Sequence, residues 1–136
     1  MKTEERMNVM KKAKKILGVL VLIMVLVTLS LVFFLTRGLE EGKALPIGEV
    51  DIYSLEDGKY IGTHSEGRWE NEVEVEVVGG IIRSIDLREG FRREEVKEEI
   101  YERVIREQSL NVEVLSGATV SSKAYLKAIE NALKGE

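Results

Sequence analysis

The stretch that decides the fold is Glu72-Val73-Glu74-Val75-Glu76-Val77-Val78, followed by Gly79-Gly80 and then by Ile81-Ile82-Arg83-Ser84-Ile85-Asp86-Leu87. Valine alternates with glutamate in its first part, and this period of two predicts a strand with one buried face and one face in water. The glycine pair predicts a tight turn, so the last part is expected to return as a neighbouring antiparallel strand. The stretch therefore predicts a hairpin within an antiparallel sheet.

The register of this hairpin predicts an irregularity in its second strand. A two-residue loop places Val77 opposite Ile82. Continued without interruption, the same register would turn Ile85 toward water. One extra residue in the strand returns such a side chain to the buried face. We therefore expect a β-bulge near Arg83 or Ser84.

Upstream residues predict a second hairpin. Apolar and polar residues alternate over 50–55, which predicts a first strand, and Glu56-Asp57-Gly58 predicts the turn after it. Residues 59–64 are expected to form the next strand, followed by a loop. A single His64 without a visible partner is expected to be structural or solvent-facing rather than a catalytic base. Trp69 is expected to pack in the core or to anchor the domain at a membrane surface.

Downstream, the spacing of apolar residues changes. Helical spacing predicts a helix over 91–107, alternation over 108–115 predicts a short strand, and helical spacing returns from Ser122 to about Lys134, with Gly135 as the stop signal. The apolar stripe of the first helix consists of Val96, Ile100 and Val104. The predicted fold is α+β, a small antiparallel sheet packed with two helices.

The N-terminal part predicts a single transmembrane helix. Residues 16–35 carry no charge, and a helix of this length spans about 30 Å, the thickness of the hydrocarbon core of a bilayer. A secretory signal peptide is the alternative, but the run exceeds a signal core and no small-x-small cleavage site follows it. The expected organisation is a cytoplasmic basic tail over 1–15, a transmembrane helix over 16–35, a linker over 36–48 and a domain over 49–136.

Charge indicates the orientation and excludes several classes of function. Four lysines lie directly before the apolar run and only Arg37 and Lys43 lie close after it, so we expect the N-terminus in the cytoplasm and the domain outside the cytoplasmic membrane. Residues 38–136 hold 13 basic and 22 acidic side chains, a net charge of −9. This balance argues against a nucleic-acid partner. The chain has no cysteine and one histidine, so disulfides are excluded and metal catalysis is poorly supported.

Ser116-Gly117-Ala118-Thr119 is the stretch that carries chemistry. A glycine in a short turn allows a ligand to approach the backbone closely. The turn directly precedes the last predicted helix, whose first N–H groups and dipole favour a phosphate. Ordinary helix capping by serine or threonine is the alternative interpretation of the same residues.

With these elements in place, the sequence resembles the FMN-binding domain family, which occurs in the C subunit of the sodium-pumping NADH:quinone reductase and in the G subunit of the Rnf complex. The resemblance runs from about Asp57 to Leu133 and rests on the opening hairpin, the valine-rich strands and the signature Asp-x-x-Ser/Thr-Gly-Ala-Thr/Ser. In the family, a separate flavin transferase attaches FMN to the last hydroxyl residue through a phosphoester. The resemblance implies Thr119 as the attachment point.

The resemblance also implies the remainder of the cofactor site. These residues are Ser116, Gly117 and Ala118 in the turn, Ser121 and Ser122 behind it, Gly62 in the opening hairpin, and Glu113 at the position of the family's aspartate. Glu113 is one methylene longer than that aspartate, so whether the transferase accepts this chain is left open. Implied partners are the flavin transferase, the lipid bilayer, and an unidentified electron donor and acceptor, among them possible membrane redox subunits.

The residues and the resemblance leave three alternative functions. The first is a membrane-anchored flavoprotein that relays electrons outside the cytoplasmic membrane, a carrier or a subunit of a redox complex rather than a stand-alone enzyme, because no nucleophile–base constellation is visible. The second is a flavin-free or non-covalently flavin-binding assembly module of the same fold. The third is a non-covalent flavin reductase.

Overall fold

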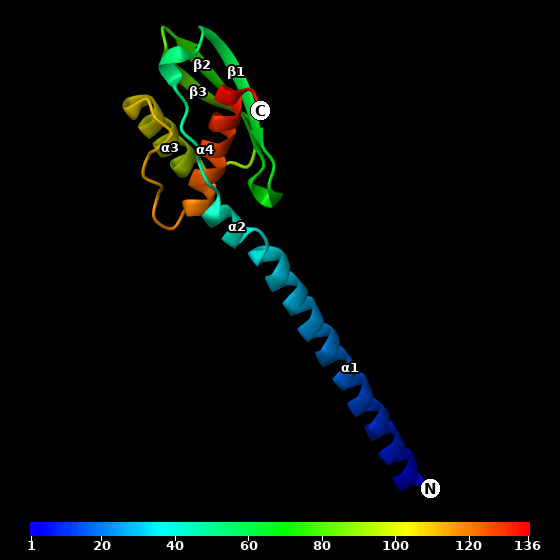
Figure 1. Ribbon diagram of the computed structural model, residues 1–136. Coiled ribbons are helices and arrows are strands. Elements are labelled where there is room, and N and C mark those ends of the chain that lie inside the picture. The colour runs from blue at the N-terminus through cyan, green and yellow to red at the C-terminus, as the bar shows by residue number, and fades with distance from the viewer. The chain divides into compact units, whose positions relative to one another are not determined.

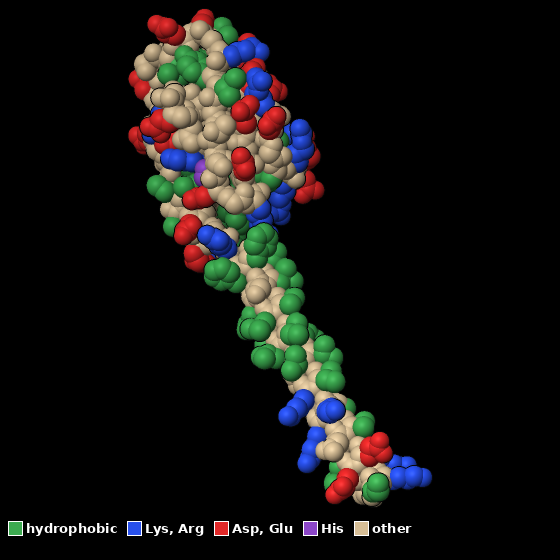
Figure 2. Space-filling view, turned by 90° about the vertical axis from the view of Figure 1, so that its right-hand side faces the viewer, with side chains coloured by type: hydrophobic (Ala, Val, Ile, Leu, Met, Phe, Trp, Pro, Cys, Tyr) green, Lys and Arg blue, Asp and Glu red, His purple; other side chains and the backbone are tan.

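The computed structural model describes all residues from Met1 to Glu136 and divides the chain into two compact units, Met1–Arg37 and Gly38–Glu136. The first unit consists of helix α1 (Lys2–Thr36), which buries none of its residues. By length and composition this helix is able to cross a membrane. Hydrophobic side chains cover its middle, and basic side chains gather toward its N-terminal end (Figure 2). The predicted basic tail belongs to the same helix, because α1 begins at Lys2.

The second unit contains the expected antiparallel sheet. Its strands are β1 (Gly58–His64), β2 (Asn71–Val78) and β3 (Ile81–Gly90), in the order β1-β2-β3. The predicted hairpin is confirmed, with Val77 opposite Ile82. The predicted bulge is confirmed as well, because Glu76 lies opposite Ser84 and Arg83 is the extra residue.

A second register shift occurs further along β3, where the pairing moves from Val73 and Leu87 to Glu72 and Glu89. Arg88 is the extra residue there. Its guanidinium reaches Glu72 (Nε to Oε1, 3.2 Å) and Glu74 (Nη1 to Oε2, 2.8 Å) on the open face of the sheet. This second bulge was not expected from the sequence.

Two predicted strands are absent. Residues 50–55 contain a 3₁₀ turn (Ile52–Ser54) instead, because the hydroxyl and the N–H of Ser54 both donate to the carbonyl of Asp51 and close the chain locally. Residues 108–115 pair with no strand. Their alternation reflects burial of Leu110 and Val112 in the core, and burial alone does not make a β-ladder.

Two long helices cover one face of the sheet, as predicted. Helix α3 (Glu94–Glu107) contributes its apolar stripe, and α4 (Thr119–Lys134) packs on β1 and β2. Figure 1 shows α4 lying across the sheet with α3 beside it. Gly135 ends α4 in the left-handed conformation, φ 72°. The residues buried most completely in this core are Val73, Val75, Val77, Ile100, Val104, Tyr125, Ala128 and Ile129.

Residues 36–48 differ from the expected linker. Six of them form helix α2 (Leu39–Ala44), which packs against α4. Gly42 makes this possible, because a Cβ there would lie 2.5 Å from Cγ1 of Val120. Trp69, in the short 3₁₀ turn Gly67–Trp69, is buried in a small apolar cluster that also contains Val120 and Ala124. The core interpretation of Trp69 is therefore confirmed.

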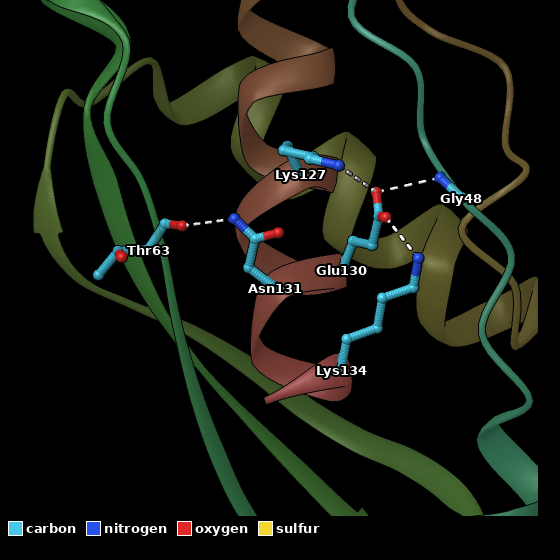
Figure 3. A network of polar contacts seen from close by, with 6 residues as sticks. All are labelled: Gly48, Thr63, Lys127, Glu130, Asn131 and Lys134. Carbon is cyan, nitrogen blue, oxygen red and sulfur yellow. Dashed lines mark hydrogen bonds and ion pairs between the residues drawn. The ribbon is translucent and has the colours of Figure 1, made fainter. Parts of the chain in front are cut away.

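A buried carboxylate joins the chain before β1 to the end of α4 (Figure 3). Glu130 is 3% exposed and binds the ammonium groups of Lys134 at 2.7 Å and Lys127 at 3.1 Å. It also accepts a hydrogen bond from the N–H of Gly48 at 3.0 Å. Burial opposes its ionisation, but these three hydrogen bonds outweigh burial and lower the pKa of Glu130 below its ordinary value.

Candidate functional site

The turn before α4 is held open toward solvent. A backbone hydrogen bond from the N–H of Ala118 to the carbonyl of Leu115, 3.0 Å long, fixes the shape of this turn. Gly117 has φ +74°, which favours glycine, and a Cβ built there would meet nothing within 4 Å. Ser116 and Gly117 are both exposed. A ligand can therefore approach this backbone closely, as the sequence analysis expected.

Thr119 is the first residue of α4 and is partly exposed. No side chain caps the helix, so the N–H groups of its first residues keep their capacity to bind an anion. The hydroxyls of Ser116 and Thr119 make no hydrogen bond within the protein, whereas Ser122 does. Its hydroxyl donates to the carbonyl of Ala118 at 2.8 Å and accepts from the N–H of Leu115 at 3.3 Å. None of these hydroxyls caps the helix, so the structure does not support the capping alternative.

The other predicted residues near the turn differ in their exposure to solvent. Ser121 and Ala118 are each 6% exposed, behind the turn rather than on its surface. Glu113 is exposed, and its carbonyl accepts a hydrogen bond from Nη1 of Arg103 at 2.6 Å. Its carboxylate forms no ion pair within the protein, and the residue lies shortly before the turn in the sequence.

Gly62 is not brought to the turn. It lies where β1 crosses α4, and a Cβ there would collide with backbone atoms of Ala128 and Ala132. These residues are 9 to 13 positions after Thr119, roughly 14–20 Å along a helix that rises 1.5 Å per residue. The structure accounts for Gly62 as a packing residue between strand and helix.

A groove of about 440 Å³ lies beside the β1–β2 connection and the end of β3. This volume is within the range of small-molecule sites. Its wall includes Asn71, which is 1% exposed, donates from Nδ2 to the carbonyls of Trp69 and Ala124, and leaves Oδ1 without a partner. A buried acceptor without a hydrogen bond is costly unless a ligand or water completes it. The groove could not be predicted from the sequence, because only the fold brings its walls together.

The groove and the turn are neighbours through α4. Ala124, which binds Asn71, is five residues after Thr119, about 7.5 Å along the helix. Phe91 lines the groove and stacks on Tyr125, the next residue of α4, with ring centroids 4.6 Å apart. The hydroxyl of Tyr125 fixes this stack by donating to the carbonyl of Phe91 at 3.1 Å. Both the turn and a residue in the wall of the groove therefore contact the first part of α4.

The charge of the groove is mainly negative. Glu70, Glu72 and Glu89 line it, and Arg68 is its one cation. The guanidinium of Arg68 lies 4.5 Å from the centroid of the Trp69 ring, which holds the charge in place by a cation–π contact. His64, which precedes Arg68 by four residues, is buried. Burial lowers the pKa of His64 despite a 3.6 Å contact with Glu66. It is therefore a structural histidine, one of the two roles expected.

One comparison with known proteins identifies the family. The model of a family described as FMN-binding domain matches residues 34–134. No curated protein matches the sequence. FMN has a phosphate and a planar ring, which suit the open turn with its free helix N–H groups and the groove with the unpartnered acceptor of Asn71. The cofactor predicted from the resemblance is therefore confirmed as FMN, and the match covers α2 and the whole sheet as well as both packed helices. This chain belongs to the FMN-binding domain family.

Proposed function

We propose that this protein is a membrane-anchored flavoprotein that carries FMN on Thr119 through a phosphoester and relays electrons outside the cytoplasmic membrane. The observation that carries the proposal is the state of Thr119. Thr119 is partly exposed, its hydroxyl makes no hydrogen bond within the protein, and the residue sits on the first turn of an uncapped helix. A hydroxyl of this kind is a weak nucleophile by itself, so a flavin transferase must activate the exchange.

The residues around Thr119 would hold the phosphate. The N–H groups at the start of α4 and the helix dipole stabilise its negative charge. Gly117 leaves the space in front of these groups free, since nothing lies within 4 Å of a Cβ built there. Ser122 ties Leu115 to Ala118 and so keeps the turn in this shape without facing the ligand itself.

The groove would hold the flavin ring, which supplies the redox chemistry when bound. Phe91 offers an aromatic surface, and Asn71 offers the unpartnered Oδ1 as an acceptor for a ring N–H. Glu72 is paired with Arg88, but the carboxylates of Glu70 and Glu89 disfavour extra negative charge on the ring, whereas Arg68 favours it. These opposed charges are the means by which this chain would set the reduction potential.

The location follows from the N-terminal helix. The four lysines before the apolar run favour the cytoplasmic side for the N-terminus. The domain, with its net charge of −9, would then lie outside, near the membrane surface and available to membrane redox subunits.

In-gel fluorescence tests the attachment. The full chain is co-expressed with a flavin transferase of this family, denatured and imaged for flavin fluorescence. We expect a fluorescent band for the wild type and for Thr119→Ser, which keeps a hydroxyl, and a dark band for Thr119→Ala. Ser116→Ala is the matched control, because Ser116 is the exposed hydroxyl of the same turn. Fluorescence that persists in Thr119→Ala and disappears in Ser116→Ala would overturn the assignment.

A domain without covalent flavin is the second candidate, and Glu113 is the observation that favours it. Its carboxylate extends one methylene beyond the family's aspartate, and its side chain is exposed. A dark wild-type band together with a fluorescent Glu113→Asp band would support this candidate. The non-covalent form would then be distinguished from a flavin-free module by binding of free FMN to the full chain in detergent.

A further inference from the structure

The outer edge of β3 and one face of α3 form a second groove. It has a volume of about 520 Å³ and is lined by residues 85–87 of β3 and by side chains of α3 from Lys97 to Ile105. None of these residues lines the groove next to the turn. Nothing in the proposed flavin site therefore uses this surface.

The edge of β3 is closed at one position and open beyond it. β3 pairs only with β2. At Ile82, the side chain of Gln108 imitates a neighbouring strand: Oε1 accepts from the N–H at 2.7 Å and Nε2 donates to the carbonyl at 3.0 Å. No backbone hydrogen bond from outside the sheet reaches Ile85 or Leu87. An open edge of this kind is a template for a further strand.

Tyr101 provides an independent sign of a missing partner. It is 6% exposed, lines the groove, and its buried hydroxyl has no hydrogen bond. Burial raises the pKa of Tyr101, so the hydroxyl keeps its proton and can both donate and accept. A buried hydroxyl without a partner is unfavourable, and a bound group that reaches it would remove this cost.

The charge of the groove selects the partner. Asp86, Glu98 and Glu102 line it. Its one cation, Lys97, already forms an ion pair with Glu94 at the start of α3. Side chains of Lys or Arg are therefore favoured in an incoming segment, and acidic ones are disfavoured.

We propose that this groove binds an extended, basic segment of another protein as a fourth strand on β3. The backbone of the segment pairs with the open edge beyond Ile82, its basic side chains face the three carboxylates, and a polar atom of it reaches the hydroxyl of Tyr101. The surface lies outside the flavin groove, so binding does not require FMN.

Peptide binding to the full chain in detergent tests this proposal. The probe is a capped peptide of alternating lysine and valine, and two variants serve as comparison peptides: one with glutamate in place of lysine, and one with N-methyl groups on the residues that would pair. We expect the first peptide to slow amide exchange over residues 84–88, and the other two to leave exchange unchanged. Equal protection by the glutamate peptide, or no protection by any peptide at millimolar concentration, would overturn the proposal. Self-association of the chain with protection of the same amides would also overturn it, since a second copy would then be the occupant.

A pair of conservative variants tests the role of Tyr101. Tyr101→Phe removes only a hydroxyl that has no partner, so the fold is expected to be kept. We expect about a three- to tenfold weaker binding of the lysine peptide, the effect of one hydrogen bond. Tyr53→Phe is the matched control, because Tyr53 is 74% exposed and lies outside the groove. Unchanged affinity in Tyr101→Phe would contradict the part assigned to its hydroxyl.

Discussion

Replacing Glu130 with glutamine is expected to destabilise the unit Gly38–Glu136 strongly. The carboxylate is 3% exposed and has three partners, the two ammonium groups at 2.7 and 3.1 Å and the N–H of Gly48 at 3.0 Å. Glutamine keeps the shape but leaves Lys127 and Lys134 without a counter-charge. Because those lysines belong to α4 while Gly48 precedes β1, the loss affects both the helix end and its attachment to the preceding chain (Figure 3).

The magnitude follows from burial and from the number of charged hydrogen bonds. A hydrogen bond to a charged group contributes about 1.5–3 kcal/mol, and removal of one partner from a buried ion pair costs about 3–5 kcal/mol. Glutamine can still accept one of the three hydrogen bonds, so we expect Glu130→Gln to lower the free energy of unfolding by about 2–3 kcal/mol. In a domain of this size, that change lowers Tm by roughly 10–20 °C.

Urea unfolding of the full chain in detergent provides the measurement, because Trp69 is the single tryptophan and is buried in the unit Gly38–Glu136. Glu40→Gln is the matched control. Glu40 pairs with Lys43 at 3.3 Å, but both side chains are exposed, 89% and 55%, so no measurable change is expected. Equal unfolding midpoints for Glu130→Gln and the wild type would refute the reasoning.

The same carboxylate predicts a dependence on pH. The pKa of Glu130 in the folded protein lies below its ordinary value of 4.5. Its contribution is therefore fully present above pH 4.5 and is lost as pH falls through the lower, folded pKa. The difference in unfolding free energy between wild type and Glu130→Gln should shrink over that range. A difference that stays constant down to pH 3 would mean that ionisation of Glu130 is not its source.

Three further substitutions test other parts of the structure. Gly62→Ala should lower the free energy of unfolding by about 3 kcal/mol, since its Cβ would meet the backbone of Ala128 and Ala132; a wild-type urea midpoint would contradict the close packing of β1 on α4. Gln108→Ala should cost about 1–2 kcal/mol and speed amide exchange at Ile82, since the side chain loses both hydrogen bonds to Ile82 and a third to the carbonyl of Ile105; unchanged exchange would remove the evidence that Gln108 closes the edge. Glu113→Asp should raise the yield of covalent flavin on co-expression with the transferase, measured as fluorescence per unit of protein; an equal or lower yield would show that the longer carboxylate is no obstacle.

The sequence could predict those elements whose apolar pattern and whose hydrogen-bonding partner both lie close by in the chain. Alternation in β2, a glycine turn and the need to keep Ile85 buried were enough to predict the hairpin and the bulge at Arg83. The apolar stripe of α3 was likewise sufficient, because a helix satisfies its own backbone. Each of these predictions depended on residues that are neighbours in the chain.

The errors have the opposite origin. Residues 108–115 show strand-like burial, but a strand also needs a paired neighbour, and the fold supplies none there. The packing of Gly62 could not be predicted either, because a Cβ there would meet Ala128 of α4, 66 positions further on. Its place in the cofactor site stays a prediction. Asn71 could not be identified as a site residue from the sequence. Only the fold shows that Nδ2 binds the carbonyl of Ala124 while the buried Oδ1 has no hydrogen-bond partner.

Mass spectrometry of the flavin-bearing peptide tests the central claim most directly. Cleavage after Arg106 and Lys123 yields the peptide 107–123, which holds Thr119 and all four nearby serines, Ser109, Ser116, Ser121 and Ser122. The proposed function predicts that this peptide, prepared from membranes of the native source, carries the mass of FMN less one water, and that fragment ions assign it to Thr119. An unmodified peptide, or FMN assigned to one of the serines, would contradict the claim that Thr119 carries the cofactor.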